Sequence, residues 1–296
     1  MLSAARIEPR EETIVRFGPT REAIVSWNTL ALVGALELRA NAYDGRTSAW
    51  LPYVAFSSDR RASLGGNDTF VRIETDVVRA DVDIVSLGIR SQGTIDALYV
   101  STPDYGAPSS IVALPALELD VPPLSQFVAA YPSERGWCAP AAIAMLLAYR
   151  GYPVDVAIVA REVFDTAYGG TGNWAFDVAF AGTLGFRAAV LHLRDLPHAH
   201  AFLADDVPLA VSIAWTAGSF PQAPLPASNG HLVVLAGITA AGDPVVADPA
   251  QPGVRVVYPR VAFERAWLGH GGIALAVMPA TLGERLARLT NDERAA

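Results

Sequence analysis

The sequence contains one cysteine, Cys138, among its 296 residues. A single cysteine excludes a disulfide within the chain and any zinc site built from several thiolates. Basic side chains are also few, because 22 lysine and arginine residues stand against 30 aspartate and glutamate residues, a net charge of -8. A nucleic-acid-binding protein needs a basic surface to displace the counterions of the phosphate backbone. The composition therefore argues against a nucleic-acid partner.

Long hydrophobic runs are missing too. The apolar stretches at 207–214 and 232–238 are far shorter than the roughly 20 residues of a membrane-spanning helix. The beginning of the chain, MLSAARIEPREET, carries charges of both signs and lacks the apolar segment of a secretory signal. We therefore expect no membrane span and a cytoplasmic location, with export by another route left open.

Apolar residues nonetheless make up 52% of the chain and charged residues 18%. This composition is typical of a well-packed globular protein. A chain of this length can bury two hydrophobic cores, so we expect two domains.

The first 120 residues show strand patterns, separated by turn-rich pieces such as SLGGND and STPDYGAPSS. Examples of the expected strands lie at 22–27, 35–42, 70–75, 84–89 and 97–100. Short strands at such intervals predict an all-β sandwich domain at residues 1–120. By analogy with other sandwiches, this domain is a candidate module for binding a carbohydrate or a protein ligand.

The pattern changes after Leu119. Helical patterns come first, at 141–149, 154–166 and 174–184, and strand patterns follow at 188–193, 209–214, 231–238, 244–248, 255–258 and 273–278. Helices followed by an antiparallel sheet make an α+β domain, which we place at residues 121–280. Residues 281–296 form a charged C-terminal tail with a helical pattern at 282–294.

The surroundings of Cys138 are those of a reactive thiol. Pro140 suits the first turn of a helix, where its missing N–H costs nothing. The alanine- and leucine-rich run that follows propagates the helix up to Gly151. Cys138 therefore falls at the helix N-terminus, where free N–H groups and the helix dipole stabilise a thiolate.

His231 and Asp248 are the candidate partners of this thiol. His231 begins the strand pattern HLVVLAGI, and Asp248 ends the next one, PVVAD. Antiparallel neighbours joined by a short connection would place the two side chains next to each other. A carboxylate that accepts from one imidazole nitrogen fixes the tautomer and leaves the other nitrogen for the thiol.

Attack on an acyl group also requires donors for the developing oxyanion. The backbone N–H of Cys138 is one candidate donor. Gln126, twelve residues earlier in the segment PPLSQF, is a second candidate through its side-chain amide.

These residues, taken in order, resemble a known family. Gln126, Trp137-Cys138-x-Pro140, Gly230-His231-Leu232 and Ala247-Asp248-Pro249 are similar to motifs of the papain-like cysteine peptidases of the bacteriocin-leader-processing peptidase-like group, and most of all to its uncharacterised bacterial branch. Gly172-Asn173-Trp174, Phe263-Glu264-x-x-Trp267 and Gly271-Gly272 match as well. Where many members have glycine or serine after the cysteine, this chain has Ala139.

The resemblance covers about residues 124–278 and implies a papain-like fold, in which Cys138 is the nucleophile, His231 the base, Asp248 the residue that orients it, and Gln126 part of the oxyanion hole. It implies a thiol-dependent peptidase or amidohydrolase that cleaves a peptide or isopeptide amide in a peptide or protein substrate. It does not imply cleavage of a double-glycine leader, because the membrane and nucleotide-binding domains of the transporter-fused members have no counterpart here.

Two alternatives remain open for the whole domain. The same triad could transfer the acyl group to an amine, as transglutaminase-like members of this fold do, or the domain could be a non-catalytic binding protein. Each residue also has a structural interpretation of its own: an inert buried thiol for Cys138, a backbone-bonded histidine for His231, a turn opener for Asp248 and a solvated linker residue for Gln126.

A second cluster, His192, Asp195, His198 and His200, offers imidazole and carboxylate groups of the kind that bind transition metals. Pro197 interrupts the segment, and the spacing of His198 and His200 matches no helical ligand pair. We therefore favour a polar loop that leads into a helix at 199–203. The proposed chemistry requires neither a metal nor an organic cofactor.

Overall fold

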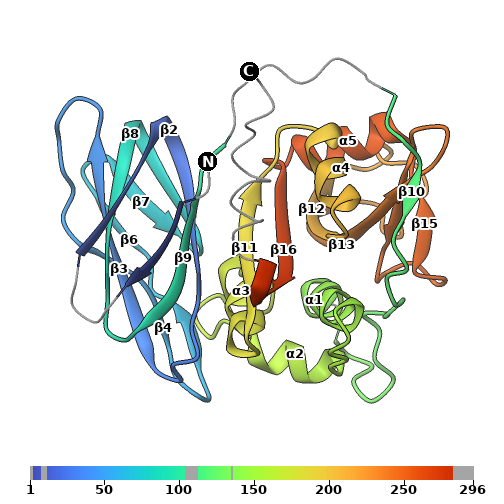
Figure 1. Ribbon diagram of the computed structural model, residues 1–296, viewed down its shortest axis with the longest axis horizontal. Helices are drawn as coiled ribbons and strands as arrows, with labels where there is room; N and C mark the ends of the chain where they lie inside the picture. The colour runs from blue at the N-terminus through green and yellow to red at the C-terminus, as the bar shows by residue number, and fades with distance from the viewer. Residues whose placement is uncertain (1–2, 8–11, 104–112, 135, 283–296) are drawn as a thin grey trace. The chain divides into compact units, whose positions relative to one another are not determined.

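The computed structural model describes residues 3–7, 12–103, 113–134 and 136–282 (Figure 1). The chain divides into two compact units. The first comprises Met1–Pro103, Glu162–Val190 and Pro279–Ala296, and the second comprises Asp104–Arg161 and Leu191–Met278. The expected boundary near residue 120 stays a prediction. The segment Glu162–Val190 belongs to the same unit as the N-terminal strands.

Within its described residues, the first unit is built on nine antiparallel strands. These are β1 (Ser3–Ile7), β2 (Glu12–Asn28), β3 (Gly34–Ala42), β4 (Leu51–Phe56), β5 (Arg61–Ser63), β6 (Gly66–Asp68), β7 (Val71–Glu74), β8 (Val77–Ser91) and β9 (Ile95–Ser101). Seven follow the order β1-β9-β2-β8-β3-β4-β5, while β7 pairs with β8 and β6 with β7. The register between β2 and β8 shifts twice, between Arg16 and Glu22, as bulges produce.

The hydrogen-bonded sheet folds back on itself. Strands β2 and β4 are separated by two others in the sheet order, which in a flat sheet would put them roughly 14 Å apart. The Tyr53 hydroxyl on β4 nevertheless donates to the backbone oxygen of Val25 on β2 at 2.7 Å, and the rings of Tyr53 and Trp27 meet edge to face at 6.3 Å. The expected all-β sandwich is thereby confirmed.

Helix α3 (Trp174–Thr183) completes the core of this unit by packing on β2. Asn173 caps the helix by accepting from the N–H of Phe176 at 3.2 Å. Gly182 permits the close approach, because a Cβ at this position would lie 2.8 Å from the Cβ of Asn28. Asn28 in turn donates to the carbonyl of Ala188 at 2.8 Å and accepts from its N–H at 3.0 Å.

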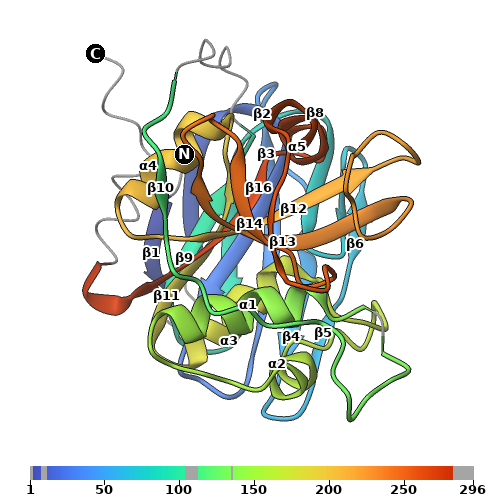
Figure 2. The ribbon, with the colours of Figure 1, turned by 90° about the vertical axis from the view of Figure 1, so that its right-hand side faces the viewer.

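The second unit contains the expected α+β arrangement. Its helices are α1 (Cys138–Tyr149), α2 (Val156–Glu162), α4 (Leu196–Ala204) and α5 (Arg260–Leu268). Its sheet contains β10 (Leu117–Glu118), β12 (Leu209–Trp215), β13 (Ser228–Ile238), β14 (Pro244–Ala247), β15 (Arg255–Val257) and β16 (Ile273–Pro279), with β10 on β13. The strand order is β11-β16-β12-β13-β14-β15, and β11 (Phe186–His192) contributes only its last two residues, Leu191 and His192, to this unit. Helix α1 packs against β13, as Figure 2 shows.

Two helices differ most from the sequence-based expectation. The helix expected at 154–166 ends at Glu162, because the buried carboxylate of Asp165 accepts the N–H groups of Ser63 and Ala167 at 3.1 and 3.0 Å and so draws the backbone out of the helix. Helix α5 was not predicted. Its buried residues Phe263, Ala266 and Trp267 have the i, i+3, i+4 spacing that could have revealed it.

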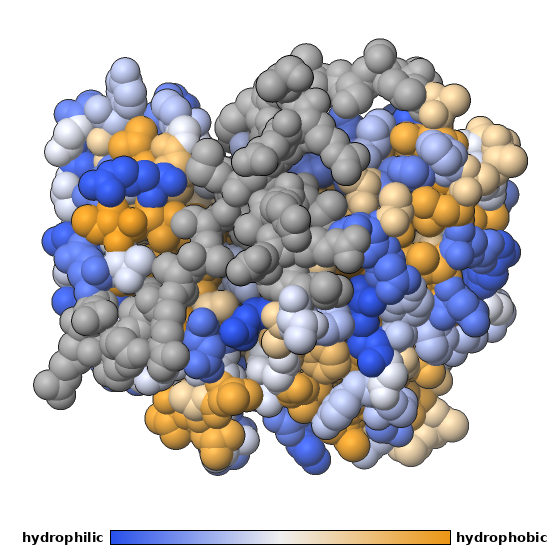
Figure 3. Space-filling model, in the orientation of Figure 1, coloured by the Kyte–Doolittle hydropathy of each residue, from blue (hydrophilic) through white to orange (hydrophobic). Residues whose placement is uncertain are grey.

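Apolar side chains also reach the surface, as the orange areas of Figure 3 show for one face. Leu30, Leu32 and Val33, in the turn between β2 and β3, are each 66% exposed. Within the described part of the chain, none of the helices combines the length and the apolar character that crossing a bilayer requires. The helical pattern expected at 282–294 lies outside the described residues, apart from residue 282 itself.

Candidate active site

Cys138 is the first residue of helix α1. Trp137 precedes the helix without a side-chain cap, and the first turn contains no acidic residue. The free N–H groups and the positive end of the helix dipole are therefore available to the thiol. The N–H groups of Ala139 and Leu232 also act on the sulfur and help to lower the pKa of Cys138. Cys138 keeps some exposure, while the residues after it, 139–147, are buried. The expected helix start is thus confirmed.

His231 lies on β13, opposite Ile213 of β12, and is 3% exposed. Strand β14 pairs antiparallel with β13 on its other side, and Asp248 follows β14 directly. The Nε2 atom of His231 is 2.8 Å from Oδ1 of Asp248. The sequence-based expectation that neighbouring antiparallel strands would bring these two side chains together is confirmed.

The carboxylate of Asp248 is fully buried and accepts three hydrogen bonds. Oδ1 accepts from His231 and from the N–H of Ala250 at 2.9 Å, and Oδ2 accepts from the hydroxyl of Tyr258 at 2.7 Å. A buried charge is tolerated only when it is paired and hydrogen-bonded, and this one meets both conditions.

The imidazole of His231 also interacts with the thiol of Cys138, and each group shifts the pKa of the other. Because Nε2 is engaged by Asp248, Nδ1 is the nitrogen that remains for the sulfur. Burial alone would lower the pKa of His231, but the hydrogen bonds to Asp248 and Cys138 and the charges of both raise it to about 10. Burial likewise opposes the thiolate, yet the interaction with His231 and the two backbone N–H groups lower the pKa of Cys138 below its usual value. The geometry therefore favours a thiolate–imidazolium pair.

Two aromatic residues form a cluster beside His231. The ring of Trp215, at the end of β12, meets the ring of His231 edge to face at 5.9 Å and 76°. Phe220 packs on Trp215 at 5.4 Å. The position of Trp215 at the end of a strand is the only local signal of this contact in the sequence.

Tyr258 was missed as a site residue, because the sequence showed it only as the last residue of an expected strand. Nothing in its immediate neighbours indicates a contact with Asp248. The contact depends on the pairing of β14 with β15, in which Ala247 lies opposite Arg255. The sequence of either strand alone does not determine this pairing register.

Gln126 is 4% exposed and lies beside the segment that carries Asp248. Its N–H donates to the carbonyl of Pro249 at 3.0 Å, and the hydroxyl of Ser125 donates to the same oxygen at 3.3 Å. Gln126 is therefore a buried, hydrogen-bonded residue and not a solvated linker residue. Its part in an oxyanion hole stays a prediction.

Residues of the His192–His200 cluster make structural hydrogen bonds. Asp195 caps α4 by accepting from the N–H of His198 at 2.8 Å, and Pro197 lies in the first turn. The ring of His200 bonds to the carbonyl of Pro115 at 2.9 Å. A helix is present as expected, but it begins at Leu196, so His198 lies within it and not in the loop before it. Among the residues with a described position, none form a group of three or more metal-ligating side chains.

Several other residues of the matching motifs support the fold. Trp267 donates from its indole nitrogen to the carbonyl of Ile273 at 2.9 Å. Gly272 has a positive φ of 65°, and a Cβ there would lie 2.1 Å from the carbonyl oxygen of Leu193. Only glycine fits at this position.

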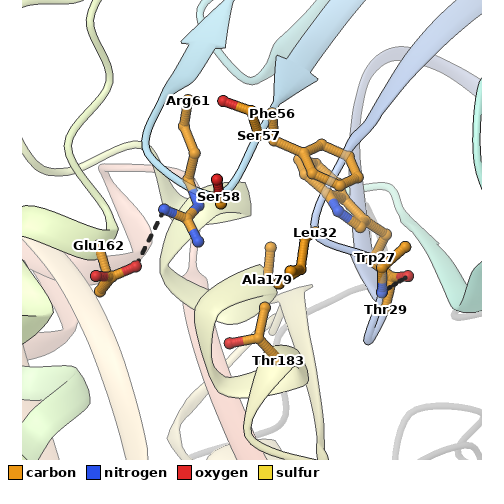
Figure 4. A pocket seen from close by; sticks show the side chains of 11 residues that line it. Trp27, Thr29, Leu32, Phe56, Ser57, Ser58, Arg61, Glu162, Ala179 and Thr183 are labelled. Atoms are coloured by element: carbon orange, nitrogen blue, oxygen red, sulfur yellow. Dashed lines mark hydrogen bonds and ion pairs between the residues drawn. The ribbon is translucent and has the colours of Figure 1, made fainter.

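A separate hollow of about 90 Å³ lies within the first unit (Figure 4). Trp27, Phe56, Leu32 and Ala179 supply apolar lining, and Arg61 extends into it, paired with Glu162 at 3.6 Å. Neither Cys138 nor its partners belong to its lining. A carbohydrate or protein ligand of this unit stays a prediction.

Comparison with protein families matches residues 118–275 to the family described as Peptidase_C39 like. No curated protein matches the chain. Among solved structures, a C39-like peptidase from Bacillus anthracis is 20% identical, with a TM-score of 0.44 over 55% of this chain and 98% of that one. A double glycine motif protease from an AMS/PCAT transporter, in complex with its leader peptide, is 22% identical, with a TM-score of 0.39 over 55% of this chain and 94% of that one.

Proposed function

The chain belongs to the peptidase C39-like family, whose model matches residues 118–275, and from that premise we propose that it is a cysteine peptidase or amidohydrolase that uses Cys138, His231 and Asp248 as a triad. The proposed substrate is a peptide or protein with a scissile peptide or isopeptide amide. A cytoplasmic location stays a prediction.

The reaction begins with attack of the Cys138 thiolate on the amide carbonyl carbon, which forms a C–S bond and places negative charge on the carbonyl oxygen. The N–H of Cys138 and the side-chain amide of Gln126 are the proposed donors to this oxyanion. The C–N bond then breaks, the imidazolium of His231 protonates the leaving amine, and a thioester remains.

Water completes the cycle. Neutral His231 removes a proton from a water molecule, whose oxygen attacks the thioester carbonyl and releases the carboxylic acid and the thiolate. Asp248 stays ionised throughout and stabilises the imidazolium each time it forms. The chain's own residues thus supply a nucleophile, a base and the residue that orients the base.

One observation carries the proposal: an imidazole that interacts with a helix-terminal thiol lies, through its Nε2 atom, 2.8 Å from a buried carboxylate. A thiol that only fills space among aliphatic side chains does not require an imidazole and a buried carboxylate beside it. The lowered pKa of Cys138 is the second property that a nucleophile needs.

The test is the fate of peptides incubated with the wild-type protein and with Cys138→Ala in water enriched in oxygen-18. Cleavage by the wild type alone, with the heavy oxygen in the new carboxyl group, supports hydrolysis. The same incubation with an added primary amine examines the alternative, because an acyl transferase would give the amide of that amine. Intact peptides in every sample would favour the non-catalytic binding protein.

A further inference from the structure

Tyr258 contacts the oxygen of Asp248 that His231 does not use. Its hydroxyl donates to Oδ2 at 2.7 Å, while His231 lies 2.8 Å from Oδ1. Tyr258 is fully buried, as is Asp248. Each oxygen of the Asp248 carboxylate therefore has its own partner: Oδ1 contacts His231, the base of the proposed triad, and Oδ2 accepts from Tyr258.

The direction of the Tyr258 proton is fixed by Gln251. The Nε2 atom of Gln251 lies 3.2 Å from the Tyr258 oxygen and 2.6 Å from the carbonyl oxygen of Gln222. An amide nitrogen has two protons, which these two acceptors use. Because the Tyr258 oxygen accepts from Gln251, its single proton is directed to Asp248. Burial and the charge of Asp248 raise the pKa of Tyr258, so the hydroxyl remains a donor.

Aromatic packing holds the ring of Tyr258 as well. Phe220 lies 4.6 Å from it, and Phe263 stacks on it at 6.5 Å and 17°. Phe220 also contacts Trp215, whose edge meets His231. The segment that contains Phe220 and Gln222 is thus joined to the site at two places, to Asp248 through Tyr258 and to His231 through Trp215.

We propose that Tyr258 is a positioning residue of this site, which holds Asp248 in the orientation that presents Oδ1 to His231, and that Gln251 orients the Tyr258 hydroxyl. The inference rests on the proposed function and adds a fourth residue to its triad. Without the hydroxyl, a fully buried carboxylate would lose one of three donors and the contact that opposes its rotation. The imidazolium, and through it the thiolate, would then lose support.

Within the described residues, four titratable groups act on one another in this cluster: Cys138 from α1, His231 from β13, Asp248 after β14 and Tyr258 after β15. Tyr258 is the only one of the four that can be altered without removing a member of the proposed triad. The substitution Tyr258→Phe retains the ring and removes only the hydroxyl.

The experiment is the rate of Cys138 alkylation by iodoacetamide between pH 4 and pH 9, which needs no knowledge of the substrate. For Tyr258→Phe we expect the rise in rate to move to higher pH and the rate at pH 6 to fall about tenfold, the size expected for a hydrogen bond to a charged group. For Gln251→Met, which leaves the hydroxyl in place but unoriented, we expect a smaller shift in the same direction.

Tyr149→Phe is the matched control, because the hydroxyl of Tyr149 also donates to an aspartate, Asp206, but at an exposed position away from the triad. Its profile should equal that of the wild type. A wild-type profile for Tyr258→Phe would overturn the proposal, even if its melting temperature fell, since that would be a packing effect alone. If Tyr258→Phe does not fold, Gln251→Met decides by the same criterion. A wild-type protein that shows no enhanced alkylation would instead contradict the proposed function.

Discussion

The Nε2 atom of His231 lies 2.8 Å from Oδ1 of Asp248, although the two residues are 17 positions apart and on different strands. Both side chains are buried, and the same imidazole interacts with Cys138 at the start of α1. The pairing of β13 with β14 and the packing of α1 on β13 bring the three residues together.

The charge of Asp248 is the first property to test. In Asp248→Asn the side chain keeps its size but cannot stabilise an imidazolium. We expect turnover to fall by about 10²- to 10⁴-fold and the alkylation rate of Cys138 at pH 6 to fall with it. Asp243→Asn is the control, because Asp243 accepts a backbone N–H from Arg260 in the same unit. If both variants behaved like the wild type, Asp248 would not belong to the site.

Gln126 can be separated from the triad by using two readouts. If its amide stabilises the oxyanion, Gln126→Ala should lower turnover of a cleaved peptide by about 10²- to 10³-fold. Alkylation of Cys138 forms no oxyanion, so its rate should not change. Equal loss in both measurements would show that Gln126 supports the structure of the site, and unchanged turnover would remove it from the mechanism.

Much of this site could be predicted from the sequence because its determinants are local. Pro140 and the alanine-rich run after it place Cys138 at a helix start, and the two strand patterns with a short connection place His231 beside Asp248. Tyr258 could not be predicted, because its contact depends on the register between β14 and β15. The grouping of Glu162–Val190 with the first unit was also beyond reach, because it depends on long-range packing such as that of Gly182 on Asn28.

Gly272 tests the fold of the second unit independently of the chemistry. Gly272→Ala would place a Cβ 2.1 Å from the carbonyl oxygen of Leu193, at a φ of 65°. We expect the free energy of unfolding to fall by about 1–3 kcal/mol, as overpacking in a tight site does. Gly253→Ala is the matched control, because nothing lies within 4 Å of a Cβ there. Urea denaturation measures both, and equal midpoints would contradict the described packing of Gly272.

We infer that His231 and the start of helix α1 together allow Cys138 to lose its proton at a lower pH than an ordinary thiol does. The pKa of Cys138 is lowered and that of His231 raised to about 10, so the ion pair should form as the pH rises through the lowered thiol value and persist until His231 loses its proton. Cys138 is the only cysteine of the chain, so every alkylated thiol reports on this site.

The most direct measurement is therefore the rate of iodoacetamide modification at pH 6, followed by mass spectrometry, for the wild type and for His231→Ala. We expect the wild type to react far faster than a cysteine in an unstructured peptide, and His231→Ala to react no faster than that peptide. A wild-type protein that reacts no faster than the peptide would contradict this expectation.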